Sequence, residues 1–327
     1  MCGFSFARFE REVRKVRKVC EVWKGIDCVI YDTLSTVHFL VSLSLLSIPT
    51  HPSSPHSRVL IFGGRGYIAG HLRSVFPTAV FPQVDICDAR AVGKILDLEK
   101  PDVVINAAGK TGKPNVDWCE DHKLETILSN VQGPLNLLDA CSKRSIYWVH
   151  IGSGCTYEGD NGGSGFTEKD SPNFTGSFYS RSKLWIDQIL KDFPVLQLRL
   201  RMPFDGTSHP RNLISKIKHY PKVLDEQNSL TYLPDFLVAA KTLIAKRKTG
   251  IYNIVNPGTI SPYEIMVRYR EIVDPKHVFE RLTLENLSNV VKAGRSNCML
   301  SSEKISQEGV KMLPVSEAVE EALKALV

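Results

Sequence analysis

From residue 58 onward the sequence predicts an α/β protein whose parallel sheet is covered by helices on both faces. Short apolar runs alternate with longer amphipathic stretches, which is the order of strand and helix in βαβ units. A glycine-rich turn follows the first apolar run, and small-residue turns follow two later runs. Because parallel strands end at one edge of their sheet, these turns should lie together. The pattern predicts a Rossmann-like, doubly wound sheet with a ligand site at that edge and a smaller C-terminal lobe.

The composition is that of an ordinary globular protein. The chain has 327 residues, 43% of them hydrophobic and 23% charged, and its formal net charge is +6. Lysines and arginines are scattered, so we expect a mixed surface that suits anionic ligands and no binding of nucleic acid. The eight cysteines show no zinc-ligand spacing. We therefore predict no metal site, and reduced thiols in a cytoplasmic protein.

Residues 1–57 differ from the rest of the chain. Residues 9–24 are rich in charge, and residues 50–57 read as a Pro/Ser/His linker. Between them, residues 37–48 form an apolar run of about 12 residues, short of the roughly 20 that cross a bilayer. We predict an N-terminal extension outside the fold; a targeting segment or a packed addition are the alternatives. No membrane contact is expected for the folded part.

The first strand and turn have the chemistry of a nucleotide site. Residues 58–62 read as a buried strand, and the glycine-rich segment 63–70 leads from it into a helix. Glycines let the backbone approach a pyrophosphate, and a helix N-terminus offers free N–H groups. The predicted cofactor contacts in this turn are Gly63, Arg65, Gly66, Tyr67 and Ile68.

The expected second strand, around residues 79–83, contains no acidic residue. An acid there would hold the ribose 2′-hydroxyl of NAD and repel a 2′-phosphate. Arg65 in the preceding turn offers a charge to that phosphate, so we predict NADPH as cofactor, with NADH as the alternative. The segment 85–88 should cap the next helix, and Asp85 is also placed to reach adenine.

The next two strands end in turns of small residues. The strand at 101–106 ends in Asn106, Ala107, Ala108 and Gly109, whose small side chains would let a cofactor lie close to the backbone. An amphipathic helix is expected from residue 115 to 142. Its buried Asn130 is predicted to brace the neighbouring strand at the cofactor site; a satisfied core amide is the alternative.

A third strand, residues 146–151, precedes Ser153 and Cys155, which point the same way if the chain stays extended. Farther on, Tyr179 and Lys183 are four residues apart, on one face of a predicted helix. An ammonium beside a phenol favours the phenolate and should lower the Tyr pKa from its usual value of about 10. Such a Tyr can exchange a proton with a substrate oxygen.

The βα alternation weakens in the last third. A strand at 195–202 ends in Arg201, Met202 and Pro203, which we expect at the cofactor. A helix should begin near residue 212 and carry Lys216, and further helices are predicted at about 261–273, 282–291 and 314–327. We predict a cofactor domain over 58–205 and a mainly substrate-binding lobe over 206–327, from which a strand near 251–256 returns to the sheet.

With these motifs in order, the chain resembles the extended short-chain dehydrogenase/reductases that act on nucleotide sugars. Within them it is similar to the dTDP-4-dehydrorhamnose reductase branch, and most of all to the plant-type 3,5-epimerase/4-reductases that make UDP-L-rhamnose. The resemblance covers residues 58–327. The strings NVDWCE (115–120) and PNFTGSFYS (172–180) are long and unusual enough to be specific.

The resemblance implies roles for the matching residues. Tyr179 would donate a proton to the C4 oxygen during reduction, Lys183 would lower its pKa, and Ser153 would hydrogen-bond the same carbonyl. The expected partner is a nucleotide sugar, and a homodimer is compatible with the family. The positions implied to contact the substrate are Thr111, Asn115, Asn212, Arg295 and Asn297.

Epimerisation needs an acid/base pair in addition. The C3 and C5 protons flank the C4 ketone, so removing either gives an enolate whose oxygen sits where Tyr179 and Ser153 point. Cys155 is placed to be one partner and Lys216 matches the second in the family. The alternatives are a small core residue for Cys155 and a solvated lysine for Lys216.

Three other functions stay open. The first is a reductase that leaves epimerisation to another enzyme. The second is a GDP-4-keto-6-deoxymannose epimerase/reductase, which shares the Ser-x-Cys spacing but lacks the NVDWCE string. The third is a regulatory subunit like the methionine adenosyltransferase β subunit, against which the intact Ser153, Tyr179 and Lys183 argue.

Overall fold

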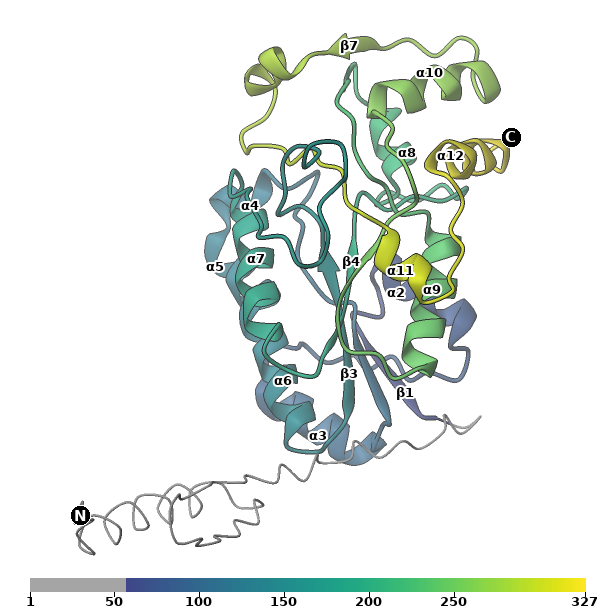
Figure 1. The fold of residues 1–327 in the computed structure, drawn as a ribbon. Coiled ribbons are helices and arrows are strands. Elements are labelled where there is room, and N and C mark those ends of the chain that lie inside the picture. The colour runs from purple at the N-terminus through teal and green to yellow at the C-terminus, as the bar shows by residue number, and fades with distance from the viewer. Residues whose placement is uncertain (1–56) are drawn as a thin grey trace, which may run out of the picture. The chain divides into compact units, whose positions relative to one another are not determined.

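A computed structural model describes residues 57–327 (Figure 1). The predicted N-terminal extension, apart from Ser57, lies outside the described residues. Within residues 57–327, no helix combines the length and the apolar character needed to cross a bilayer.

The centre of the fold is a five-stranded parallel sheet, as the sequence predicts. Its spatial order is β1-β2-β3-β4-β6, and each strand is in register with its neighbour, for example Val59 with Val103 and Leu200 with Ile254. All five strands are short and largely buried, which is typical of a sheet covered on both faces. Their bounds are β1 Val59–Phe62, β2 Val103–Asn106, β3 Tyr147–Ser153, β4 Leu196–Leu200 and β6 Gly250–Ile254.

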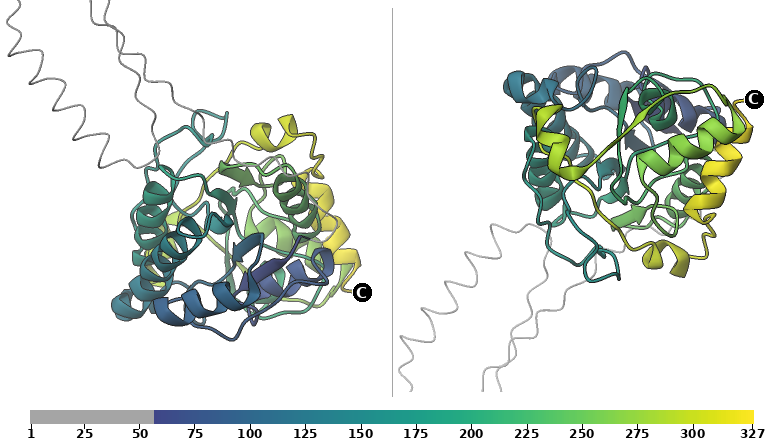
Figure 2. Two further views of the ribbon diagram at one scale, coloured as in Figure 1. Left: turned by 90° about the horizontal axis from the view of Figure 1, so that it is seen from below. Right: turned by 90° about the horizontal axis from the view of Figure 1, so that it is seen from above.

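Helices cover both faces of the sheet (Figures 1 and 2). Alternate residues of β1 pack against the one layer or the other. In β1, Val59 and Ile61 pack in the same core cluster as side chains of α2 (Tyr67–Val75) and α9 (Leu233–Ala245). Leu60 and Phe62 pack instead in a cluster with α3 (Ala89–Glu99), α6 (Gly133–Ser142) and α7 (Phe178–Leu190). This alternation follows from the two-residue period of a strand. It gives the α/β sandwich that the sequence predicts.

The expected strand at 79–83 is reduced to a single bridge. Val80 pairs with Leu60, and its N–H and C=O bond to Val59 and Ile61 at 2.9 and 2.8 Å. Pro82, two residues later, has no N–H to continue a ladder. The outer edge of β1 is therefore covered by one residue of the predicted strand.

The expected continuous helix over 115–142 is wrong. The segment consists of α4 (Trp118–Asp121), α5 (Lys123–Ile127), the π-helix η1 (Leu128–Gln132) and then α6. Pro134, near the start of α6, cannot donate the usual bond to the carbonyl four residues earlier. The wider turn of the π-helix accommodates this missing hydrogen bond. Asn130 lies within the π-helix.

The C-terminal lobe has its own core. Apolar side chains of α8 (Leu213–Ile217), α10 (Pro262–Ile272) and α12 (Val315–Lys324) form it together with β5 (Lys222–Leu224). β5 pairs in parallel with β7 (Glu280–Leu282), a small sheet that the sequence did not predict. The helix expected at 282–291 is the 3-10 helix η2 (Leu284–Asn289), and α11 (Glu303–Gln307) was missed.

The boundary between the predicted parts, 58–205 and 206–327, stays a prediction. α9 and β6, both from the later part, pack onto the main sheet. A compact core of the lobe is nevertheless separate from the two clusters that cover the sheet.

Candidate active site

Many of the predicted cofactor-binding and catalytic residues lie at the carboxyl ends of β1, β2 and β3 and in the first two turns of α7. Gly63 shows how tightly the first two turns meet. Its φ is +81°, and a Cβ added there would lie 2.6 Å from the backbone nitrogen of Ala108. Only glycine fits this position, because the glycine-rich turn rests on the Asn-Ala-Ala-Gly turn.

The start of α2 has the features of a dinucleotide site. The N-cap residue is Gly66, so no side chain caps the helix, and the first turn holds no acidic residue. The first N–H groups of the nine-residue helix, including those of Tyr67 and Ile68, are left for a phosphate. Arg65 is exposed beside them. These residues fit a dinucleotide cofactor.

Asp85 has a local bond of its own. Its Oδ1 accepts from the backbone N–H of Cys87 at 2.9 Å, and Asp88 caps α3 through the N–H groups of Arg90 and Ala91. The expected cap is therefore present, formed by Asp88. A contact between Asp85 and adenine stays a prediction.

A buried chain of polar groups runs across the sheet from the Asn-Ala-Ala-Gly turn. Asn106 is fully buried, and its Nδ2 lies 3.2 Å from Nδ1 of His150. Nε2 of His150 lies 3.4 Å from Nζ of Lys183, which also donates to the carbonyl of Ile151 at 3.2 Å. Burial lowers the pKa of Lys183, while the negative charges of Asp187 and Cys155 oppose that shift.

Helix α7 begins just before Tyr179 and Lys183, the pair predicted to be catalytic. Ser177 caps it by accepting from the N–H of Ser180, and Glu120 Oε1 accepts from the N–H of Phe178 at 2.6 Å. These bonds fix the helix turn that carries Tyr179. The expected lowering of the Tyr179 pKa is wrong for the cofactor-free protein, because burial raises it.

Ser153 and Cys155 come together, although not by the extended geometry we expected. β3 ends at Ser153 and the chain turns, so that the N–H of Cys155 faces Oγ of Ser153 at 3.4 Å. A hydrogen bond from Ser153 also opposes the rise in the Tyr179 pKa, so serine, phenol and thiol share one site.

Burial raises the pKa of the Cys155 thiol, and four neighbours oppose that rise. Hydrogen bonds from Ser153 and Ser180 favour the thiolate, as do the charges of Arg201 and Lys183. Arg201 is 7% exposed, and its guanidinium donates to Asn228 and to the carbonyl of Ser296. We predicted Arg201 at the cofactor; the structure places it beside the segment that carries the thiol.

Met202 and Pro203 lie at the start of the lobe. Met202 packs against the core of the lobe, and the carbonyl of Pro203 accepts from the N–H of Leu213. Their contact with a cofactor stays a prediction.

Asn130 joins the Asn-Ala-Ala-Gly turn to α7. Its side chain accepts from the N–H of Lys110 at 2.7 Å and donates to the carbonyl of Lys110 at 2.9 Å and to Ser182 Oγ at 3.1 Å. Its Oδ1 lies 3.5 Å from the position that a Cβ on Gly109 would occupy. These bonds join the turn after β2 to α7, and a contact of Asn130 with the cofactor stays a prediction.

Residues 115–121 bind the segment that was predicted to meet the substrate phosphates. Arg295 makes a two-pronged ion pair with Asp117, at 2.8 and 2.9 Å, and Asp117 also accepts from the N–H of Ala293. Asn115 accepts from the N–H of Asp117 at 2.8 Å. Arg295 is thus held by a carboxylate, with its side chain 20% exposed.

The remaining predicted substrate contacts differ in accessibility. Thr111 accepts from Arg211 at 2.6 Å, which ties the turn after Gly109 to the lobe. Asn297 is half-buried and accepts from Asn228 at 3.0 Å. Asn212 is fully buried, caps α8 and donates to Asp205 and Thr207, so this structure does not support it as a substrate contact.

Lys216 lies on α8, where burial and then the charge of Arg211 lower its pKa. Among the hydrogen bonds and ion pairs of residues 57–327, none joins Lys216 to Cys155 or to Tyr179. The structure therefore brings together Ser153, Cys155, Tyr179 and Lys183, but it does not bring Lys216 into contact with them.

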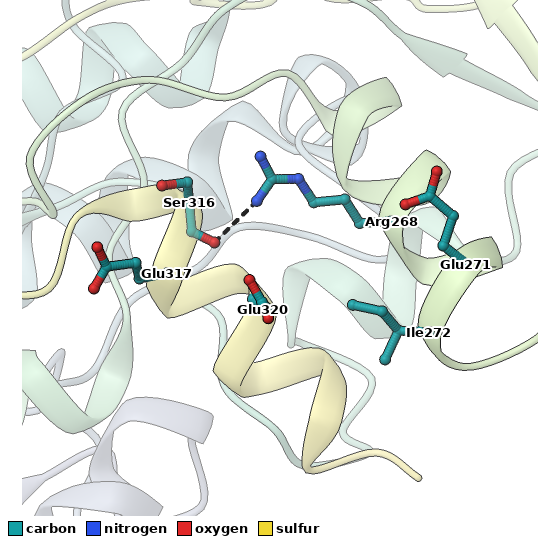
Figure 3. A pocket seen from close by; sticks show the side chains of 6 residues that line it. All are labelled: Arg268, Glu271, Ile272, Ser316, Glu317 and Glu320. Carbon is teal, nitrogen blue, oxygen red and sulfur yellow. Dashed lines mark hydrogen bonds between the residues drawn. The ribbon is translucent and has the colours of Figure 1, made fainter.

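Two surface hollows are lined wholly or mainly by residues of the C-terminal part of the chain. One, of about 480 Å³, runs between α10 and α12 and is lined by Arg268 and three glutamates; none of the predicted site residues lines it (Figure 3). The other, of about 330 Å³, is lined by Phe174, Leu287, Lys292 and Arg295 among others. Both cations of the second hollow are already paired with carboxylates, Lys292 with Asp121 and Arg295 with Asp117.

Several residues of the site were missed. Glu120 and Asp117 lie in the string NVDWCE, which we noted as unusual without assigning these bonds. Arg211 lies in the segment HPRN and could have been singled out as a charge beside Asn212. His150 carries no sequence signal, since a histidine within a buried strand is more often a core residue.

The chain matches known proteins over most of its folded part. Residues 68–195 match the model of the NAD dependent epimerase/dehydratase family. The bifunctional dTDP-4-dehydrorhamnose 3,5-epimerase/dTDP-4-dehydrorhamnose reductase of Arabidopsis thaliana is 39% identical over 278 residues, which cover 82% of this chain and 92% of that protein.

Two further relatives have similar sequences. A trifunctional UDP-glucose 4,6-dehydratase/UDP-4-keto-6-deoxy-D-glucose 3,5-epimerase/UDP-4-keto-L-rhamnose-reductase of Arabidopsis thaliana is 37% identical; the match covers 82% of this chain and 42% of that longer protein. The crystal structure of the L780 UDP-rhamnose synthase of Acanthamoeba polyphaga mimivirus is 31% identical, with a TM-score of 0.78, over 82% of this chain and 99% of that chain. The chain therefore belongs to the NAD dependent epimerase/dehydratase family, in the branch of the dTDP-4-dehydrorhamnose reductase-like and UDP-rhamnose synthase proteins.

Proposed function

We propose that this protein is a nucleotide-sugar epimerase/reductase that converts UDP-4-keto-6-deoxyglucose to UDP-L-rhamnose. The observation that carries the proposal is the convergence of Ser153, Cys155, Tyr179 and Lys183 at one edge of the sheet. Serine, tyrosine and lysine together suit a ketone reductase. The thiol beside them is an additional acid/base that plain reduction does not need.

A bound nicotinamide cofactor supplies the hydride for the C4 ketone, and the protein supplies the proton. Tyr179 donates its phenolic proton to the C4 oxygen while Ser153 hydrogen-bonds the same oxygen. In the cofactor-free protein burial raises the Tyr179 pKa, so the phenol is protonated and ready to donate. Lys183 lies one helical turn away. In its ammonium form it stabilises the phenolate that remains after Tyr179 has donated its proton.

Epimerisation uses the same oxygen-binding groups. When a base removes the proton at C3 or C5, the developing enolate oxygen is stabilised by Tyr179 and Ser153. Cys155 is the group that can take or return the carbon proton, because Arg201 and its serine neighbours favour the thiolate. Lys216, whose pKa is lowered by burial, is the proposed partner once substrate brings the lobe and the sheet site together.

The proposed cofactor is NADPH, with NADH as the alternative. Arg65 is exposed in the glycine-rich turn, and residues 79–83 offer no acid to a ribose. The substrate's nucleotide is proposed to lie near Arg295, where the second hollow opens. A homodimer is also proposed, since Trp185 and Ile189 of α7 and Phe193 in the turn that follows it are exposed apolar side chains.

The test is solvent-proton exchange with UDP-4-keto-6-deoxyglucose and NADPH in D₂O, with products identified by NMR. Wild type should give UDP-rhamnose with deuterium at C3 and C5. Cys155→Ser should lose deuterium at one or both carbons, by about 10²–10⁴-fold in rate, because one general acid/base is removed. It should still reduce a 4-keto sugar that is already epimerised.

Cys141→Ser is the matched control, because Cys141 is equally buried but lies in the cluster between the sheet and α6. Full deuterium incorporation by Cys155→Ser would contradict the assignment of Cys155. A reductase without epimerase activity would then be the better-supported function. It is the second candidate because no contact joins Lys216 to Cys155 in the described residues. A wild type with no turnover at all would refute both and favour a regulatory subunit.

A further inference from the structure

His150 lies at the centre of the buried polar chain but has no part in the proposed chemistry. It is on β3 and is fully buried. One ring nitrogen, Nδ1, is 3.2 Å from Asn106 Nδ2, and the other, Nε2, is 3.4 Å from Lys183 Nζ. Burial holds the pKa of His150 well below its usual range, and the charge of Lys183 adds to that shift. The ring is therefore neutral and carries one N–H.

The bonds of Asn106 determine which nitrogen carries that proton. Its Oδ1 accepts from the backbone N–H of Ala108 at 3.0 Å, so its amide nitrogen faces the ring. An amide nitrogen can only donate, and Nδ1 of His150 must accept. The N–H of the neutral ring is then on Nε2, and it points at Lys183.

This arrangement suits a neutral amine better than an ammonium at Lys183. An ammonium has three N–H groups and no lone pair, so it would set a donor against the Nε2–H donor. A neutral amine accepts from Nε2–H and still donates to the carbonyl of Ile151 at 3.2 Å. Lys183 is 5% exposed, and its burial acts in the same direction.

The other charged groups near the pair do not reverse this balance. Asp187, one turn farther along α7, favours the ammonium, but it is already paired with Arg199 at 3.4 Å. Cys155 acts on Lys183 only as a thiolate, and burial raises its pKa. On its own strand, His150 has the neutral ring of Trp148 as an aromatic neighbour.

We propose that His150 holds Lys183 as a neutral amine in the cofactor-free protein, and that Lys183 takes up one proton from solution when an anionic dinucleotide binds. The inference rests on the proposed cofactor-dependent function. The diphosphate and hydroxyl groups of a dinucleotide favour the ammonium, and the ammonium is the form that assists the phenol of Tyr179. His150 is thus a positioning residue that couples cofactor binding to a proton.

The test is calorimetric titration of the full-length protein with NADPH. Titrations in two buffers of different ionisation enthalpy, at several pH values from 6.5 to 9, give the number of protons taken up per cofactor. Wild type should take up close to one proton at alkaline pH and fewer as the pH falls through the lowered pKa of Lys183. Affinity should then fall by up to about tenfold per pH unit at the alkaline end, because one proton is linked to binding.

His150→Gln is the informative variant. The amide of Gln offers a carbonyl oxygen near the place of Nε2, and an ammonium can donate to it. Lys183 then keeps its proton without cofactor, and proton uptake should fall to near zero while binding persists. His219→Gln, at an exposed histidine of the lobe, is the matched control and should leave the uptake at the wild-type value.

The outcomes separate this inference from the proposed function. Binding of NADPH by wild type without proton uptake, or equal uptake by His150→Gln and wild type, overturns the inference alone. Failure of both NADPH and NADH to bind wild type refutes the cofactor-dependent function and the inference with it. If His150→Gln does not fold, ¹⁵N NMR of the wild-type imidazole decides: the Nε2–H tautomer supports the proposal and the Nδ1–H tautomer overturns it.

Discussion

The buried ion pair between β4 and α7 offers a quantitative test of how α7 is held on the sheet. Arg199 on β4 and Asp187 on α7 are 3.4 Å apart, with side chains 2% and 4% exposed. Arg199 also donates to Asn253 Oδ1 at 3.0 Å. Arg199→Met keeps much of the volume but leaves the Asp187 carboxylate buried without its main partner.

Breaking a buried pair by removing one member typically costs about 3–5 kcal/mol. We expect the lower end for Arg199→Met, about 3 kcal/mol, because the unpaired carboxylate would favour protonation of Lys183, whose ammonium form then stabilises Asp187. For a chain of this size that corresponds to a fall in Tm of roughly 6–12 °C. The double variant Asp187→Leu/Arg199→Met removes both charges and should lie within about 1 kcal/mol of wild type.

The cost of Arg199→Met should also depend on pH. Burial already raises the pKa of Asp187, and loss of Arg199 raises it further. Between the unfolded and the folded pKa, the folded protein binds more protons than the unfolded chain, so stability falls as pH rises. The destabilisation should therefore be smaller at pH 5 than at pH 8.

Urea denaturation of wild type, both single variants and the double variant at the two pH values measures these differences. A double variant as unstable as the sum of the single ones would refute the reasoning, because the two charges would then not act as a pair. An Arg199→Met cost that is unchanged between pH 5 and pH 8 would show that Asp187 does not titrate there.

Two further predictions concern catalysis and cofactor choice. Tyr179→Phe should abolish reduction of the 4-keto sugar while NADPH still binds, since only the transferable proton is lost; unchanged NADPH oxidation would contradict the role of Tyr179. Wild type should show a higher kcat/KM with NADPH than with NADH, and Arg65→Ala should narrow that difference by lowering the NADPH value; a clear preference of wild type for NADH would mean that Arg65 does not meet a 2′-phosphate.

Local patterns were enough to predict the sheet and the turns at its edge. The strand at 58–62 and its glycine-rich turn can be predicted from a few adjacent residues. A run of apolar residues indicates a buried strand, and the glycines that follow it indicate a tight turn. The same holds for Tyr179 and Lys183, whose spacing is set by one helical turn. The alternation of strand and helix then predicts that the strands of the sheet run parallel.

Features that depend on tertiary contact could not be predicted. Asp117 and Arg295 are 178 positions apart, and neither carries a local signal for the other. The three-residue strands β5 and β7 are too short to show a period, and Val80 pairs alone because Pro82 follows it. The direction of the Tyr179 pKa shift was mispredicted for the same reason, since burial, which spacing does not reveal, raises this pKa.

The short segment from Asp117 to Asp121 constrains how the protein can open. It is bonded to the first turn of α7 through Glu120 and to residues 292–295 through Asp117 and Asp121. Any outward movement of residues 292–295 must either break these ion pairs or pull on the turn that carries the phenol. Residues 292–295 and the first turn of α7, far apart in the sequence, are therefore mechanically coupled through this one segment.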